Sequence, residues 1–203
     1  MKKVFLIVMT VLFVFGLCGC FFEGVSLLYS DYAEANGFFI AINKTANCCF
    51  VGNYECTEYT ENFEITIPDH YDGIPIKRIG GYYGSGVPTP FYISLYDLYM
   101  NAPSGSKYGG IFAGDISDFN LPDTYTVEDV VFTLNIGKNI EAIEFVVMDL
   151  YFPHINENGS LTLYHSVVYI NCSEENEHFY SQDGKLYDKK TNELVSDFAY
   201  LAS

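Results

Sequence analysis

The stretch ITIPDHYDGIPIKRIG, residues 65–80, places short apolar steps on both sides of a polar turn. Isoleucine alternating with polar residues is typical of a short β-strand. The turn carries Asp72-Gly73 and separates the first strand from a second apolar step. Neither step is long enough to bury its own apolar face. The apolar positions are Ile65, Ile67, Ile76 and Ile79.

The same pattern returns later in the chain. LNIGKNIEAIEF, residues 134–145, repeats the order of apolar, polar and apolar residues, a turn, and a second apolar step. A third apolar segment, SLTLYHSVVYINC at residues 160–172, ends in a polar corner. Short strands that recur in this way must stack on one another to build a core layer by layer. The side chains expected to share that core include Ile67, Ile79, Ile136 and Ile143.

Three β-hairpins are predicted where turn residues separate short apolar runs. The first joins FFIAIN (Phe38–Asn43) to CCFVGNY (residues 48–54). The second spans roughly residues 149–170 and turns at Asn-Glu-Asn-Gly. The third spans residues 180–187, where Asp183-Gly184 provides the positive φ angles of a tight turn.

These segments together resemble the BspA-type leucine-rich-repeat surface proteins. The resemblance rests on the segments ITIPDHYDGIPIKRIG, LNIGKNIEAIEF and YINCSEENEHFYSQDGKLYDKKTNEL, with GNYECTEYTENFEITIP before the first repeat. The resemblance implies a mainly β fold: a short, degenerate leucine-rich-repeat-like β-solenoid with an N-terminal β-hairpin cap. The chain departs from the family after Gly80, where the usual Ala-Phe and Cys-x-x-Leu steps are missing. A long insertion, residues 81–129, stands in their place.

The N-terminus has the pattern of a lipoprotein signal peptide. Two lysines precede an apolar run, residues 4–17, that is shorter than the ~20 residues of a membrane-spanning helix. Leu17-Cys18-Gly19-Cys20 resembles the bacterial lipobox, which implies cleavage before Cys20 and a diacylglyceryl group on its thiol. The alternative is an ordinary secretory signal that is cut elsewhere.

This assignment divides the chain into three parts. Residues 1–19 are a signal peptide that is removed, residues 20–37 are a lipidated tether, and residues 38–203 are the repeat-like β domain with its insertion. Within the tether, residues 26–35 fit a short helix. The mature protein would lie on the extracytoplasmic face of the cell membrane, held by acyl chains on Cys20.

The composition indicates a folded and strongly acidic protein. The formal net charge is −16, from 26 acidic and 10 basic side chains. A surface of this charge argues against nucleic acid as a partner. Hydrophobic residues make up 49% of the chain, which places it among folded and not disordered proteins.

Four cysteines would remain beside the lipidated one. Cys49, Cys56 and Cys172 are candidates for a disulfide, because disulfides form outside the cytoplasm. The alternative is that these thiols are free and buried. Cys48 directly precedes Cys49, so on a strand the two face opposite sides. No CxxC pair is present, which argues against zinc, and we predict no metal site and no cofactor.

The insertion is rich in tyrosine among glycine, serine and proline. A loop of this length in a compact chain is usually functional or disordered. FYISLYDLYM, residues 91–100, fits a short helix. Tyrosine has a flat apolar face and a hydroxyl, which suit protein interfaces and sugar stacking; the alternative is that the rings pack the insertion onto the rest of the chain. The candidate binding residues are Tyr82, Tyr83, Tyr92, Tyr96 and Tyr99.

The sequence shows no motif for catalysis. It lacks GxSxG, HExxH and a P-loop. Acidic pairs such as Asp115/Asp118 and Glu174/Glu175 fit solvated loops, whereas a glycosidase needs two carboxylates across a cleft. The histidines, none spaced with another as a metal pair, are His70, His154, His165 and His178.

We therefore predict a non-enzymatic cell-surface lipoprotein that acts as a binding or adhesion scaffold for a protein or glycan partner. An alternative is a structural envelope protein without an external ligand. A more distant alternative is an extracellular hydrolase. Exposure of the insertion's tyrosines in one patch would favour the binding scaffold, and their burial would favour the structural protein.

Overall fold

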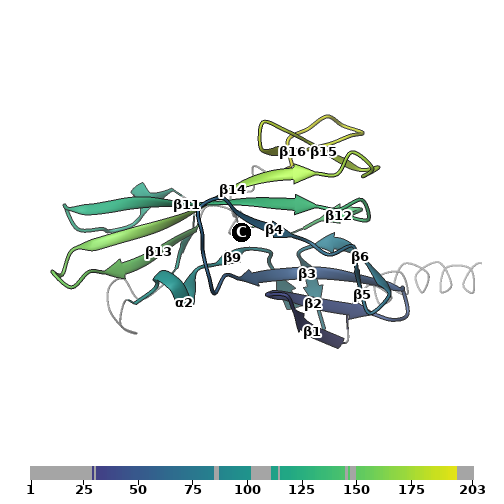
Figure 1. The fold of residues 1–203 in the computed structure, drawn as a ribbon, viewed down its shortest axis with the longest axis horizontal. Helices are drawn as coiled ribbons and strands as arrows, with labels where there is room; N and C mark the ends of the chain where they lie inside the picture. The colour runs from purple at the N-terminus through teal and green to yellow at the C-terminus, as the bar shows by residue number, and fades with distance from the viewer. Residues whose placement is uncertain are drawn as a thin grey trace, which may run out of the picture.

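The computed structural model describes most of the chain after residue 28. The described residues are 29, 31–84, 87–101, 111–113, 115–144, 146 and 150–195. The signal peptide, residues 1–19, and Cys20 lie outside the described residues, so both stay predictions. The fold is mainly β, as predicted (Figure 1).

The larger sheet contains seven strands among the described residues. They are β1 (Asp31–Ala35), β2 (Phe38–Asn43), β3 (Cys48–Glu55), β5 (His70–Tyr71), β6 (Ile74–Ile79), β9 (Ile93–Ser94) and β12 (Ala142–Ile143). Their order is β1-β2-β3-β6-β12, with β5 paired to β6 and β9 to β3. The pairs β1–β2 and β2–β3 are antiparallel, whereas β3, β6 and β12 run parallel to one another.

The second sheet has five strands within the described ranges. They are β4 (Phe63–Thr66), β10 (Phe112–Ala113), β11 (Tyr125–Ile136), β13 (Leu150–Ile155) and β14 (Leu161–Cys172). Their order is β10-β13-β14-β11-β4. Strands β11 and β14 run parallel over 12 residues each, and in Figure 1 they reach left beyond the larger sheet.

Smaller elements complete the described chain. They are the hairpins β7 (Gly81–Tyr83) with β8 (Val87–Thr89) and β15 (Phe179–Gln182) with β16 (Lys185–Asp188), the one-turn helix α2 (Tyr96–Tyr99) and the 3-10 turn η1 (Ile116–Asp118). The three hairpins predicted from sequence are confirmed as β2–β3, β13–β14 and β15–β16. In the third, Asp183 and Gly184 have φ angles of 53° and 75°, as the turn requires.

Parallel pairing places the sequence repeats beside each other. Strand β4 pairs with β11 so that Ile65 lies opposite Leu134, and β14 places Ile170 on the other side of Leu134. In the larger sheet, β12 pairs with β6 so that Ile143 lies opposite Ile79. The repeat seen in the sequence therefore corresponds to adjacent strands in both sheets, with three layers of chain side by side at Leu134.

Polar side chains connect the same three layers on their outer face. Asn171 Nδ2 donates to Asn135 Oδ1 at 2.9 Å, and Asn135 Nδ2 donates to Thr66 Oγ1 at 3.2 Å. The three residues occupy paired positions in β14, β11 and β4. Because a shift of one residue would break both hydrogen bonds, this ladder favours the observed register.

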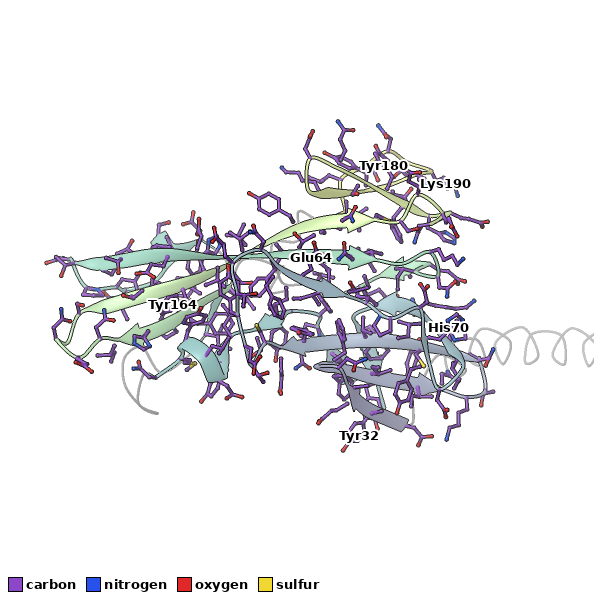
Figure 2. All side chains as sticks on the ribbon, viewed as in Figure 1. Tyr32, Glu64, His70, Tyr164, Tyr180 and Lys190 are labelled. Atoms are coloured by element: carbon purple, nitrogen blue, oxygen red, sulfur yellow. The ribbon has the colours of Figure 1, made fainter. Side chains whose placement is uncertain are left out.

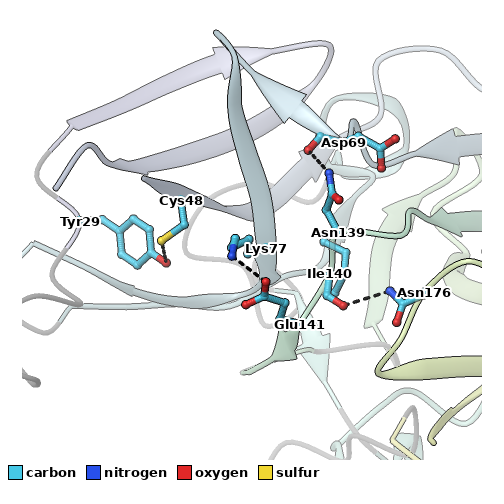
Figure 3. A network of polar contacts seen from close by, with 8 residues as sticks. All are labelled: Tyr29, Cys48, Asp69, Lys77, Asn139, Ile140, Glu141 and Asn176. Carbon is cyan, nitrogen blue, oxygen red and sulfur yellow. Dashed lines mark hydrogen bonds and ion pairs between the residues drawn. The ribbon is translucent and has the colours of Figure 1, made fainter. Parts of the chain in front are cut away.

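A buried amide holds the turns that follow the strands. Asn176 is 1% exposed, and its Nδ2 donates to the carbonyls of Gly137 at 2.9 Å and Ile140 at 3.0 Å. Figure 3 shows the bond to Ile140. Its Oδ1 accepts the backbone N–H groups of His178 and Phe179, both at 2.8 Å. The two Nδ2 bonds join the polar corner after β14 to the turn after β11, and the two Oδ1 bonds hold the corner itself.

A second set of contacts joins the first layer to the next. Asn139 Nδ2 donates to the Asp69 carbonyl at 3.1 Å, and Lys77 Nζ pairs with Glu141 Oε1 at 2.6 Å (Figure 3). The first layer supplies Asp69 and Lys77, and the second supplies Asn139 and Glu141. Each pair therefore adds a side-chain bond to the parallel backbone pairing.

One hydrophobic core joins the two sheets. Ile65, Ile67, Ile79 and Ile136 are each at most 3% exposed and belong to one cluster, and Ile143 packs against it. This confirms the prediction that the isoleucines of the two repeats share a core. Full burial of an isoleucine side chain contributes about 1.5–3 kcal/mol, so the layers stabilise one another mainly through these contacts.

The β2–β3 hairpin is buried on both faces. Ile40 and Val51 belong to the main core, whereas Ala41 and Phe50 form a second cluster with Tyr29. Strands covered on both faces have continuous apolar sequences instead of alternating ones. This explains the unbroken apolar runs at FFIAI and CCFV.

Two predicted boundaries are wrong. Residues 31–35, assigned to the tether and within the predicted helix at 26–35, form strand β1 instead. The free edge of β2 offers hydrogen-bond partners along the whole segment, and this pairing overrides the helix preference of alanine and glutamate. Residues 125–129, assigned to the insertion, belong to β11, where they pair with residues 161–165 of β14.

The helix predicted over residues 91–100 is mostly absent. Only Tyr96–Tyr99 is helical, as α2. Ile93–Ser94 pairs with the end of β3 as β9, and Phe91 forms a bridge with Val146. Phe91 and Leu95 are nonetheless buried, so the apolar pattern identified core positions but not their conformation.

Candidate functional site

The five candidate tyrosines do not form one patch. Tyr82 and Tyr96 are exposed by 42% and 52%, whereas Tyr83, Tyr92 and Tyr99 are half-buried. They lie on different elements: Tyr82 and Tyr83 on β7, Tyr92 directly before β9, and the other two on α2. The prediction of a shared binding surface on the insertion is therefore corrected: the insertion is divided between the β7–β8 hairpin and the two larger sheets.

Two of these tyrosines pack against the main core. Tyr99 stacks on Tyr164 of β14 with ring centroids 4.0 Å apart, and its carbonyl lies 2.9 Å from His154 Nδ1. Tyr92 also contacts the main core, and its carbonyl accepts the backbone N–H of Tyr54 at 2.9 Å. Burial raises the pKa of both phenols. Tyr92 and Tyr99 therefore attach the insertion to the sheets.

Tyr83 belongs to an aromatic cluster on the outer face of β1 and β2. Its ring meets those of Tyr32 and Phe39 edge to face, each with centroids 5.9 Å apart. Tyr32 in turn stacks on Phe39 at 5.6 Å. Beneath them, Tyr29 and Phe50 meet edge to face at 4.6 Å. Figure 2 shows Tyr32 beside β1, far from Tyr164 in the other part of the molecule.

An open cleft of about 430 Å³ adjoins this cluster. We call it the tyrosine cleft. Its walls come from β1, from β2 and the turn after it, from the β5–β6 turn, and from β7. The lining residues are Asp31, Tyr32, Ala33, Ile42, Lys44, Tyr71, Asp72, Ile74 and Tyr83.

Local structure places the charged groups of the cleft. Lys44 follows β2, and its Nζ lies 3.0 Å from Asp31 Oδ2 on the paired strand β1. This hydrogen bond to Asp31 raises the pKa of Lys44. Asp72 and Gly73 have φ angles of 49° and 76° and form the tight β5–β6 turn. The cleft thus combines three tyrosines with two carboxylates and one ammonium group.

A second hollow lies at the β1–β2 turn and is a weaker candidate for a binding site. Its volume is about 280 Å³, and it contains no tyrosine. Its polar side chains include Glu34 and Glu55. In the part of the chain that the structure describes, no three His, Cys, Asp or Glu side chains form a group that could hold a metal ion.

The residues weighed for catalysis from the sequence do not line the tyrosine cleft. His165 lies on β14, where its Nδ1 is 2.9 Å from Asp129 Oδ1 and its ring stacks on Tyr151. His154 contacts α2 and the ring of Tyr164. These contacts position the imidazoles within the second sheet, so neither histidine faces the carboxylates of the cleft.

The structure contains no disulfide among the described cysteines. Cys48, Cys49, Cys56 and Cys172 are free and at most 8% exposed. Of the two alternatives that the sequence left open, the structure therefore has buried thiols. Cys48 and Cys49 face the two different clusters, as expected for adjacent strand residues. Burial raises the pKa of Cys49 and Cys56 to about 11.

Comparison with known proteins finds no match: no family model, no curated protein and no solved structure matches this chain. Within the described residues, no helix is long and apolar enough to cross a membrane.

Sequence reasoning identified one wall of the cleft and missed the others. Tyr83 was among the candidate residues, whereas Tyr32 and Asp31 fell in the predicted tether. Tyr71 and Asp72 lie in the β5–β6 turn, and nothing in the sequence of that turn indicates which strand it faces. No sequence signal singles these residues out, because acidic-aromatic pairs such as Tyr71-Asp72 also occur as Tyr96-Asp97 and Tyr187-Asp188, outside the cleft.

Proposed function

We propose that this protein is a non-enzymatic lipoprotein, anchored through a diacylglyceryl group on Cys20 to the extracytoplasmic face of the cell membrane. There it acts as a binding or adhesion scaffold for a protein or glycan partner. The observation that carries the binding role is the tyrosine cleft, where aromatic rings and charged groups from four elements meet on the surface of a sheet. Concave sites that combine aromatic walls with a few polar groups are typical of ligand binding.

We also propose that the stacked layers are a short, degenerate leucine-rich-repeat-like β-solenoid, capped by the β2–β3 hairpin. Three features support this proposal. The repeats pair in parallel at Ile65, Leu134 and Ile170. Asn135 belongs to a polar ladder along the same strands. Asn176 connects the turns of successive layers.

Anchoring and binding would support each other. Two acyl chains provide stable attachment, whereas one chain binds a membrane only marginally. Many copies on one surface would engage a repetitive partner together, so that a weak single site gains avidity. A shallow cleft of modest volume suits this mode of attachment.

One observation favours a structural envelope role instead. Tyr92 and Tyr99 pack against the core, so these tyrosines fasten the insertion to the sheets. If all aromatic contacts served this purpose, the protein would need no external ligand. The exposure of Tyr32, which is 59%, favours the binding role.

The anchor and the binding role can be tested separately. Cells producing the full-length chain should incorporate radiolabelled palmitate into it, and Cys20→Ala should abolish the label. Liposomes that carry the lipidated chain should be retained on immobilised surface proteins or glycans, and Tyr32→Ala should reduce this retention. Retention that is the same for liposomes with and without the chain would contradict the binding role.

A further inference from the structure

The Tyr32 side chain is held in place by aromatic neighbours and yet stays exposed. Its ring stacks on Phe39 with an interplanar angle of 19° and centroids 5.6 Å apart. Tyr83 packs edge to face against the same ring and holds it in place. Despite these contacts, Tyr32 is 59% exposed at the wall of the cleft. A fixed flat ring of this kind can stack on the apolar face of a sugar ring.

Hydrogen-bond donors and acceptors line the cleft together with the Tyr32 ring. Asp31 Oδ2 and Lys44 Nζ form an ion pair at 3.0 Å, yet their side chains remain 49% and 73% exposed. Asp72 adds a second exposed carboxylate from the β5–β6 turn. A carboxylate accepts hydrogen bonds and an ammonium group donates them, whereas a hydroxyl does both. Neighbouring hydroxyl groups can therefore satisfy all three side chains at once.

The charge of the cleft selects against anionic ligands. Two carboxylates and one ammonium group leave a net negative charge, and the whole chain carries −16. Anionic sugars would be repelled by this field. A cationic group would have to compete with Lys44, which already pairs with Asp31. An uncharged ligand avoids both penalties.

The size of the cleft favours a small saccharide over a protein surface. Its volume of about 430 Å³ lies within the roughly 300–1,000 Å³ of small-ligand sites. A stable protein partner would need about 800 Å² of surface on each side. Apart from Tyr32, the aromatic residues lining the cleft are half-buried, which leaves little apolar area for such an interface.

We propose that the tyrosine cleft binds an uncharged oligosaccharide, with one sugar ring stacked on Tyr32 and its hydroxyls bonded to Asp31, Lys44 and Asp72. This inference rests on the proposed binding role and names the ligand class for it. Single-site affinity is expected to be weak, so the experiment uses multivalent display.

The test uses fluorescent liposomes that carry the full-length lipidated chain. They are applied to an array of cellotetraose, maltotetraose, triacetylchitotriose and a hyaluronan tetrasaccharide, and in parallel to an array of surface proteins. The variants are Tyr32→Ala and Asp72→Asn. Asparagine tolerates the positive φ at residue 72, so the turn is kept while the charge is removed. Tyr96→Ala is the matched control, because Tyr96 is 52% exposed but does not line the cleft.

We expect the liposomes to be retained by at least one uncharged saccharide and not by hyaluronan. Tyr32→Ala should lower retention about tenfold or more, Asp72→Asn should lower it less, and Tyr96→Ala should leave it unchanged. Two results would overturn the saccharide proposal: no retention on any uncharged glycan, whether or not hyaluronan retains the liposomes, or equal retention of wild type and Tyr32→Ala.

The protein array separates this failure from failure of the proposed function. Tyr32-dependent retention on a protein, without retention on glycans, would refute the saccharide ligand and keep the binding scaffold. Absence of retention on both arrays would refute both. Circular dichroism of each variant shows whether lost retention reflects lost folding, and Asp72→Asn supplies an independent reading if Tyr32→Ala is unfolded.

Discussion

At the scale of single residues, the interior depends on a few buried polar groups whose hydrogen bonds cannot be replaced by others. Asn176 is the clearest example. Its amide makes four hydrogen bonds to backbone groups, and no water can replace them because the side chain is 1% exposed. A polar residue in the corner after β14 looks like an ordinary turn residue in the sequence. Its importance follows only from the turn that packs against it.

Asn176→Ala should lower the free energy of unfolding by about 2–4 kcal/mol, because backbone groups are left buried without partners. Urea unfolding followed by circular dichroism measures this change. Asn171→Ala is the matched control: it removes a solvent-exposed amide from the ladder and should cost less than about 1 kcal/mol. Equal losses for the two variants would contradict this account of Asn176.

The buried thiols predict how stability depends on alkaline pH. In the folded chain the pKa of Cys49 and of Cys56 is about 11, above the ordinary value of 9.0. The folded state therefore keeps these protons after the unfolded state has lost them. Their contribution is complete below pH 9 and is lost as the pH rises from 9 to 11. Urea unfolding at stepped pH should show this decline, and Cys49→Ala should make it shallower than in the wild type.

At the scale of elements, the sequence predicts what local chemistry determines. The hairpins β2–β3, β13–β14 and β15–β16 follow from turn residues between apolar runs, and all three are present. Strand β1 could not be predicted in the same way. The sequence DYAEA has no apolar alternation of its own, and the segment is a strand because β2 offers it an edge. The one-turn α2 shows the same limit, since pairing with β3 takes residues that would extend the helix.

Two turns of the same type offer a matched test of element packing. Gly73 and Gly184 have φ angles of 76° and 75°, and each follows an aspartate of similar φ. A Cβ at Gly73 would meet nothing within 4 Å, whereas a Cβ at Gly184 would lie 2.4 Å from the Tyr169 ring. Gly73→Ala should cost about 1 kcal/mol from backbone strain alone, and Gly184→Ala roughly 2–3 kcal/mol.

The two glycine costs are read from thermal and urea unfolding. Gly184→Ala should destabilise the protein more than Gly73→Ala does, and adding Tyr169→Ala should remove this extra destabilisation because the obstructing ring is gone. If Gly184→Ala lowered stability as much in the Tyr169→Ala background as in the wild type, the contact between β14 and the β15–β16 turn would not be the cause.

The first half of strand β11 is exposed and the second half contributes to the core, so truncating a side chain should cost little stability in the first half and much in the second. Leu134 is 1% exposed between Ile65 and Ile170, so Leu134→Ala should cost about 2–5 kcal/mol. Val127 on the same strand is 45% exposed, and Val127→Ala should cost less than about 0.5 kcal/mol. Similar costs for both would show that the layers do not meet at Leu134.

At the scale of the whole molecule, the stacking of the repeats could be predicted and the tyrosine cleft could not. The stacking follows from a pattern that occurs twice in the chain, because short layers of similar pattern bury their apolar side chains by packing against each other. The cleft depends on four elements meeting at one edge of the larger sheet. Tyr32 and Tyr83 are separated by 51 residues (83 − 32) and touch only after β1, β2 and β7 are in place.

The central claim is that chain layers distant in sequence lie in parallel register and share their apolar side chains. Methyl-labelled nuclear magnetic resonance tests this claim most directly, through nuclear Overhauser effects between isoleucine and leucine methyl groups. The account predicts direct effects from Leu134 to both Ile65 and Ile170, and from Ile79 to Ile143. If the methyl groups of each repeat showed effects only within that repeat, the layers would not be stacked and the account would be wrong.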